Sequence, residues 1–216
     1  MKNLLLSLVL VNTCMSVIAQ NMAKDVFTKE EIVWFGLDFS KSKMVGQFDQ
    51  GGGAAPASGS DIKSKYVSSW NGVIVNEQEK YNLKKTFRKT TVVRDLAVVE
   101  KSNSKIDPDN FLTYNDYKFK DADETVAEII GSYTKGEQAD GIGLVFIVEY
   151  FSKIDQKASI YVTFFDITTK KVLFKEHLFG KPGGFGLRNY WVKTIYDILK
   201  QIDGGNYKSW KSKYDK

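Results

Sequence analysis

Cysteine and histidine are almost absent from this chain of 216 residues, which contains only Cys14 and His177. Cys14 lies within the first nineteen residues, which have the pattern of a removable leader. Without it, no disulfide, thiol nucleophile or cysteine metal site can form. Zinc binding and Ser-His-Asp chemistry would both have to involve His177. We therefore expect no metal, no cofactor and no catalytic residues, and an enzyme is the less favoured class of protein.

Arginine is scarce as well, and the net charge of +5 comes mainly from lysine. Nucleic-acid readers depend on the planar fork of arginine, so this composition predicts a solvated surface and no nucleic-acid binding. Long apolar runs are also lacking. After the leader, none approaches the ~20 residues that a membrane-spanning helix needs. We expect no transmembrane segment in the mature chain.

Residues 1–19 have the pattern of a secretory signal peptide. Lys2 gives a positive start, residues 4–11 form a short apolar run, and residues 17–19 suit a cleavage site. This predicts an exported protein, periplasmic or secreted. The alternative is a lipoprotein signal acylated at Cys14. Thr13 is larger than the residue that usually precedes such a cysteine, so we favour cleavage after Ala19.

The remaining chain is long enough to bury one core without disulfides or metals. We expect a polar lead-in at 20–30, a single α/β domain at 31–205 and a basic, aromatic tail at 206–216. Residues 46–60 include three consecutive glycines and small side chains, which indicate a flexible loop. Such a loop is either a mobile surface segment or a lid over a ligand.

The residue pattern predicts a mixed α+β fold with the order β-α-β-α-β-β-β-α. The strands are expected at 31–39, 91–100, 142–151, 158–165 and 171–179. The helices are expected from Asp61 as N-cap towards Phe87, at 121–133, and from 187 to 202, where Gly204 and Gly205 end the helix. The last three strands form a meander, and helices cover the mixed sheet.

A glycine-rich corner at 180–186 precedes the last helix. Glycines there could expose backbone amides to an anion, with two cations nearby. The spacing matches neither a P-loop nor a dinucleotide-binding loop, and a tight strand-to-helix corner explains the glycines equally well. We retain a small anionic-ligand or carbohydrate site, or a hydrolase site, as the alternative function. Its candidate ligand-binding residues are Lys181, Gly183, Gly184, Gly186 and Arg188, with Glu149 from the central strand.

Glu149 interrupts an apolar run, and a buried carboxylate needs a partner. With Asp166 and Glu176 it is a candidate for paired carboxylate chemistry, although exposure at an edge or a lysine partner is the favoured explanation. His177 lies next to Glu176 in a strand, so the two side chains point to opposite faces. We interpret it as an ordinary strand histidine.

Tyr207, Trp210 and Tyr214 alternate with lysines in the tail. Such a stripe can stack on sugars or lie at a membrane interface. We favour the alternative in which a terminal helical turn packs its aromatic side chains on the domain.

The last seventy-odd residues contain Ala139-Asp140-Gly141 before a long apolar strand, Thr169 to Leu173 after the next strand, and then the glycine corner and final helix. In these features they resemble a fold family of Gram-negative envelope proteins. Its members include the periplasmic domain of the curli-secretion lipoprotein and the N-terminal domain of the Tol-Pal translocation protein. The resemblance implies a non-enzymatic envelope module that binds or assembles with other envelope proteins. The first half of the chain matches only in element order.

Overall fold

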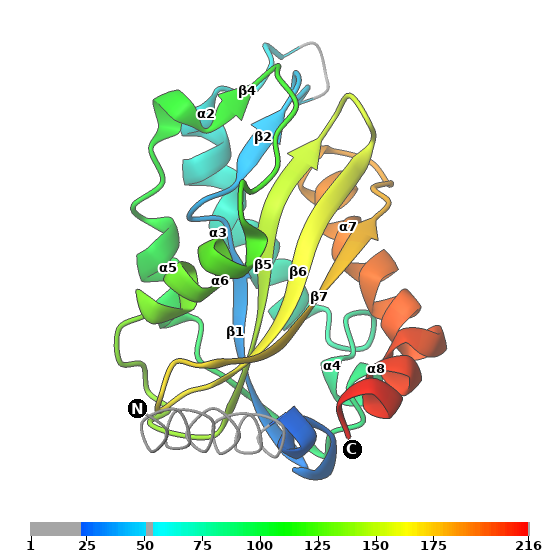
Figure 1. Cartoon of the computed structure of the whole chain (residues 1–216). Coiled ribbons are helices and arrows are strands. Elements are labelled where there is room, and N and C mark those ends of the chain that lie inside the picture. The colour runs from blue at the N-terminus through cyan, green and yellow to red at the C-terminus, as the bar shows by residue number, and fades with distance from the viewer. Residues whose placement is uncertain (1–22, 51–53, 216) are drawn as a thin grey trace, which may run out of the picture.

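The computed structural model describes residues 23–50 and 54–215. The predicted signal peptide with Cys14 lies outside the described residues, as do the start of the lead-in, part of the glycine-rich loop and Lys216. The described residues form a mixed α+β fold, as predicted, in which a mostly parallel sheet is covered by helices (Figure 1).

Strand β5 (Ile142–Ser152) is the centre of the sheet. Along one edge it pairs in parallel with β1 (Glu31–Asp38) and, further on, with β2 (Lys43–Val45). Beyond these lie the short strands β3 (Thr91–Arg94) and β4 (Leu112–Thr113), also parallel. Along the other edge, β5 pairs antiparallel with β6 (Lys157–Asp166), which pairs antiparallel with β7 (Val172–Gly180). The predicted C-terminal meander is therefore confirmed.

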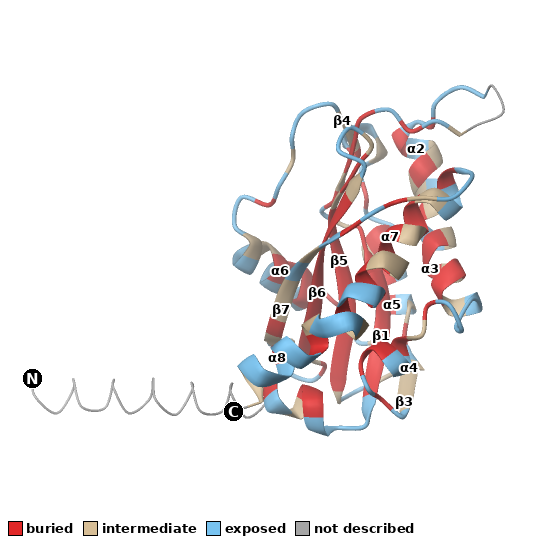
Figure 2. Ribbon diagram, turned by 90° about the vertical axis from the view of Figure 1, so that its right-hand side faces the viewer, coloured by how far each residue is buried: buried red, intermediate tan, exposed pale blue. Residues whose placement is uncertain are grey.

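Strands β1, β5 and β6 are buried on both faces, whereas β7 is mostly half-buried or exposed (Figure 2). On β5, Leu144 and Phe146 point to one face, here called the first face, while Val145 and Ile147 point to the second face. This double burial explains why β5 is a continuous apolar run rather than an alternating one.

Two groups of helices cover the two faces. The first face packs on α3 (Ser68–Asn76), α4 (Leu83–Thr86), α7 (Leu187–Gln201), α8 (Tyr207–Tyr214) and a short helical segment at 23–28. The second face packs on α5 (Ala97–Asn103) and α6 (Ala122–Gly131), with Phe119 from the segment between β4 and α6.

Buried amides hold the junction between β1 and β2, where the strand breaks. Asn71 Oδ1 accepts from the Leu37 amide at 2.7 Å, and Asn103 Oδ1 accepts from the Phe39 amide at 2.7 Å. The Asn103 amide also donates to the Leu37 carbonyl at 3.0 Å. These side chains satisfy backbone groups that the sheet no longer pairs.

Two predicted elements end earlier than expected. The strand at 91–100 ends at Arg94, and its second half is helix α5, in which Val98 and Val99 are buried against the second face. Their β-branched side chains suggested a strand, but burial on a helix satisfies them equally. Helix formation from Asp61 stops at Asn76, and only the short α4 follows before Phe87.

The chain does not leave helical structure at Gly204 and Gly205 either. It continues through a π-helical segment at Ile202–Asn206, kinked at Gly205, into α8. Tyr207 and Trp210 are buried on the first face, and Tyr214 stacks on Phe174 with 4.3 Å between ring centroids. The packing of the tail aromatics on the domain is confirmed, so the carbohydrate alternative for them is withdrawn.

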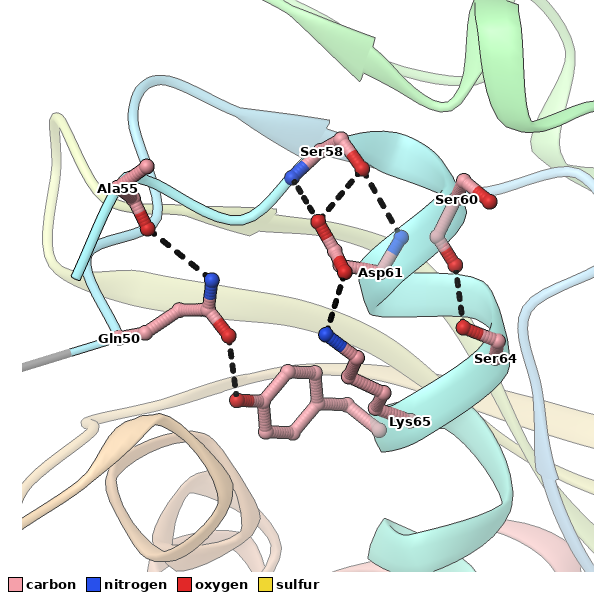
Figure 3. Close-up of polar contacts among 8 residues, drawn as sticks. Gln50, Ala55, Ser58, Ser60, Asp61, Ser64 and Lys65 are labelled. Atoms are coloured by element: carbon pink, nitrogen blue, oxygen red, sulfur yellow. Dashed lines mark hydrogen bonds and ion pairs between the residues drawn. The ribbon is translucent and has the colours of Figure 1, made fainter.

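The N-cap of the first long helical stretch is Ser58 rather than Asp61. Ser58 caps α2 (Gly59–Asp61), which continues through a π-helical segment at Ile62–Val67 into α3. Asp61 completes a capping box with Ser58 and pairs with Lys65 at 2.6 Å (Figure 3). Gln50 donates to the Ala55 carbonyl at 3.0 Å across the glycine-rich loop.

Candidate functional site

Glu149 is the best-buried acidic side chain of the meander, with 3% of its surface exposed. The register of β5 against β6 shifts between Val148 and Tyr150, so Glu149 is the extra residue of a β-bulge. Glu149 continues the alternation of Val145 and Ile147, so its carboxylate lies on the second face, next to the segment before α6. The bulge changes the alternation that follows, because Phe151 packs on the first face.

The partners of Glu149 are neutral groups and a histidine. Its Oε1 accepts from the Phe119 amide at 2.7 Å, and its Oε2 accepts from the Ser159 hydroxyl at 2.6 Å. Ser159 Oγ also lies 2.6 Å from His177 Nε2, which is 3.6 Å from Glu149 Oε2. The expected edge exposure or lysine partner of Glu149 is therefore wrong.

The direction of these hydrogen bonds decides what the cluster can do chemically. A carboxylate only accepts, so the Ser159 hydroxyl donates to Glu149 and accepts from an Nε2–H group of His177. In a Ser-His nucleophile the imidazole must instead accept the hydroxyl proton. Ser159, which is fully buried, is consequently held between its two partners rather than activated.

Burial governs the titration of the aromatic groups around this cluster. It lowers the pKa of His177 below 6.5; the Glu149 carboxylate opposes this fall and the Lys175 ammonium adds to it. Burial also raises the pKa of Tyr161 to about 12, and Glu149 contributes to the rise. Both rings are therefore neutral near pH 7.

A groove of about 370 Å³ opens above the cluster, with Glu149 and His177 in its wall. His177 and Phe179 form its aromatic side, with tilted rings whose centroids are 4.6 Å apart, and Phe179 is 47% exposed. Tyr161, which does not line the groove, stacks on His177 with 4.3 Å between centroids. Charged side chains complete the wall: Asp116, Lys118, Asp155 and Lys157. The groove combines an apolar contact surface with hydrogen-bonding groups at its rim.

The groove adjoins the outer edge of β7, which forms one margin of the sheet (Figure 1). β7 pairs only with β6 among the described strands. Gln201 donates to the Phe179 carbonyl at 2.8 Å, so this carbonyl points away from β6. Edge strands with free backbone groups are templates for another strand.

The other candidate carboxylates lie elsewhere. Glu176 points to the first face, where it accepts from Lys213 and Tyr214 of α8, each at 2.9 Å. Asp166 lies at the opposite end of β6 and accepts from the Thr169 amide in the following turn. The three carboxylates that the sequence suggested as possible pairs are not brought together.

The glycine-rich corner is a tight turn. Gly184 and Gly186 have positive φ angles, and the Gly183 amide donates to the Tyr190 carbonyl at 3.0 Å. The Lys181 amide donates to Asp197 of α7 at 3.0 Å. Arg188 is exposed and contacts its neighbour Asn189 at 3.3 Å. The candidate residues of the corner lie on the side of α7, whereas Glu149 belongs to the groove on the second face.

A hollow of about 180 Å³ does lie at this corner, and Gly186 is part of its wall. Its cation is Lys153, whose ammonium lies 4.7 Å from the centroid of the Tyr190 ring; neither Lys181 nor Arg188 lines it. Phe185 stands at the rim and is 92% exposed.

Sequence reasoning missed Ser159 and the pairing of Glu149 with His177. Their positions in three successive strands were predicted, but the register of these strands, which brings the three side chains together, has no signature in the residue pattern. A carboxylate, a serine and a histidine within one predicted meander was the available signal.

No group of three or more His, Cys, Asp or Glu side chains could hold a metal ion within residues 23–50 and 54–215. In the same ranges, no helix is long and apolar enough to span a bilayer. Comparison with known proteins gave no match to any family model, curated protein or solved structure.

Proposed function

We propose that this protein is a non-enzymatic, exported module that binds other envelope proteins through strand β7 and the groove beside it. The observation that carries the proposal is the open edge of β7 next to an aromatic groove. An extended segment of a partner adds to such an edge by main-chain hydrogen bonds, and the groove receives one of its side chains.

The geometry of β7 defines which backbone groups the partner would meet. The Phe179 carbonyl points outwards, towards Gln201. Alternate residues of an antiparallel strand direct their backbone groups to the same edge. Lys175 and His177 therefore present an N–H and a carbonyl each to the open edge, in the part of β7 whose register with β6 is regular.

The hydrogen bonding of the groove favours binding over catalysis. Both oxygens of Glu149 and the hydroxyl of Ser159 are already engaged by neighbours in the fold. A general base or nucleophile needs a free position towards its substrate. The alternative hydrolase or anion site at the glycine corner has less support, because Lys181 and Arg188 do not line the hollow there.

Export and the envelope setting rest on the sequence. The pattern of residues 1–19 supports secretion, with cleavage after Ala19, and the resemblance to envelope proteins supports an assembly role. Determining the N-terminal residue of the mature protein tests this part. A chain that begins at Gln20 supports it, and a lipid on Cys14 would replace a free protein with an anchored one.

The binding surface is tested by capture from the envelope fraction of the producing cells, with Lys175→Pro and the matched Lys175→Ala. Both variants lose the ion pair of Lys175 with Asp123, measured at 3.0 Å, but only proline removes the outward N–H. We expect Lys175→Ala to retain the partners of the wild type and Lys175→Pro to lose them.

Phe179→Ser provides a second variant that leaves the backbone of β7 intact. It removes the exposed aromatic side of the groove, and we expect about tenfold weaker retention of the same partners. Thermal melts verify that each variant is folded. Equal capture by the wild type, Lys175→Pro and Phe179→Ser, or no captured partner at all, would overturn the proposal.

A further inference from the structure

A third pocket lies on the first face of the sheet, apart from the groove and from the hollow at the glycine corner. It has a volume of about 180 Å³ and is formed where the C-terminal end of α3 meets α4 and the end of β3. Ile74, Leu83 and Val92 supply apolar wall, and Trp34 of β1 and Tyr81 lie deeper, only 1% and 2% exposed.

Two residues of this wall each carry a buried polar side-chain atom that makes no hydrogen bond with the described residues. The described residues leave three such side-chain atoms, and two of them are Trp34 Nε1 and the Tyr81 hydroxyl. An unmade buried hydrogen bond is unfavourable, and native proteins rarely keep one without a reason. The indole N–H can only donate, so it needs an acceptor that the neighbouring side chains do not provide.

Tyr81 is also able to donate. Burial raises the pKa of its hydroxyl, and the ammonium of Lys80 opposes this rise by its charge and by a long contact with the phenol oxygen, which leaves the hydroxyl proton free to donate. The hydroxyl therefore stays protonated at neutral pH. The pocket thus has two donors from neutral rings, supplied by different parts of the chain.

Two cations stand at the rim. Arg94 and Lys84 both line the pocket, and neither forms an ion pair with any described residue. Trp34 and Arg94 are directly paired between β1 and β3, so their side chains lie next to each other on the same face. A guanidinium beside an indole N–H is a suitable pair of donors for one carboxylate.

We propose that this pocket binds a small carboxylic acid with a short apolar chain, whose carboxylate accepts from Arg94 and from Trp34 Nε1. Its volume is below the range of about 300–1,000 Å³ that accommodates drug-sized ligands, so the ligand has only a few carbon atoms. The apolar wall suits the chain of the acid, and Lys84 adds positive charge at the rim. This site is independent of the partner surface at β7, which lies at the other margin of the sheet.

Sodium isobutyrate is the first probe, titrated into the full mature protein by calorimetry and by the fluorescence of tryptophan. We expect saturable binding of one equivalent with a Kd of about 1 mM or tighter. Arg94→Gln should weaken it about tenfold or more, because it removes a charge-assisted bond. Arg188→Gln is the matched control, since it removes an exposed guanidinium at the distant glycine corner, and it should leave the affinity unchanged.

Tyr81→Phe removes one hydroxyl and keeps the ring, so it tests the pocket with little risk to folding. We expect about threefold to tenfold weaker binding, and Trp34→Phe should act in the same direction. Absence of saturable binding to the wild type would overturn the proposal, as would equal affinity of Arg94→Gln or Tyr81→Phe. Inorganic phosphate that competes as strongly as isobutyrate would contradict the assignment to carboxylic acids.

Discussion

Glu149 is held in place by an amide, a hydroxyl and an imidazole, none of which is a fixed positive charge. Desolvation of a carboxylate is expensive, and hydrogen bonds to both oxygens offset much of it. The residue also links the Phe119 backbone to β6, so it fastens the segment before α6 onto the sheet. Glu149 therefore stabilises the fold, and it also forms part of the wall of the groove.

Replacing Glu149 tests this structural role. Glu149→Ala leaves the Phe119 amide and the Ser159 hydroxyl without their acceptor, and we expect a loss of about 2–5 kcal/mol in the free energy of unfolding. Glu149→Gln retains one oxygen acceptor and should cost less than half as much. Urea denaturation measures both. Equal stability of Glu149→Ala and the wild type would show that the hydrogen bonds are not formed.

His177 makes stability depend on pH in a defined direction. Because its pKa in the folded state lies below 6.5, the unfolded chain binds more protons as the pH falls through this value. The contribution of His177 to the free energy of unfolding is complete above pH 6.5 and declines below it. We expect the urea midpoint of the wild type to fall more than that of His177→Gln, whose amide can still donate to Ser159.

Aspartate and glutamate side chains titrate in both proteins, so only the difference between the two curves of urea midpoint against pH reports on His177. Parallel curves for wild type and His177→Gln would contradict the lowered pKa. A wild type that becomes relatively more stable on acidification would reverse its sign.

At the scale of elements, the meander and its closing helix follow directly from the residue pattern. β5, β6, β7 and α7 each match a predicted element to within one or two residues. The bulge at Glu149 and the helix at Ala97–Asn103 do not follow from it. The helix is decided by burial in the tertiary structure, because Val98 and Val99 are apolar enough to suit either a strand or a helix.

The glycine corner is another place where the residue pattern does not decide the structure. Its residues fit both a tight turn and an anion site, and only the distances in the structure distinguish these two alternatives. A Cβ atom on Gly180 would lie 2.3 Å from the Thr194 carbonyl oxygen of α7, so this glycine is required for the close approach of β7 and α7. At the other glycines of the corner, an added Cβ atom would meet no atom as close as this one.

Two alanine substitutions separate a required glycine from a dispensable one. Gly180→Ala forces β7 and α7 apart, and we expect it to destabilise the fold by about 1–3 kcal/mol or more. Gly72→Ala, within α3, meets no atom within 4 Å and should stabilise the fold by about 0.5–1 kcal/mol, since alanine favours a helix. Thermal unfolding compares them. A Gly180→Ala variant as stable as the wild type would rule out the close contact.

At the scale of the whole molecule, our two binding proposals fall at opposite margins of the sheet, and the sequence does not reveal either margin. The parallel margin carries the small pocket between α3, α4 and β3, and the antiparallel margin carries β7 and the aromatic groove. Trp34 and Arg94 are sixty residues apart in the chain, and only the pairing of β1 with β3 brings them together. Sequence periodicity predicts faces of strands, but it does not predict which distant strands are neighbours.

Hydrogen exchange of the β7 amides, with and without a captured partner, tests the proposed binding mode most directly. If the partner adds a strand to this edge, the amides of Lys175, His177 and Phe179 should exchange more slowly in the complex, while those of Phe174 and Glu176 change little. Unchanged exchange at these three amides, with protection elsewhere on the surface, would contradict binding at β7.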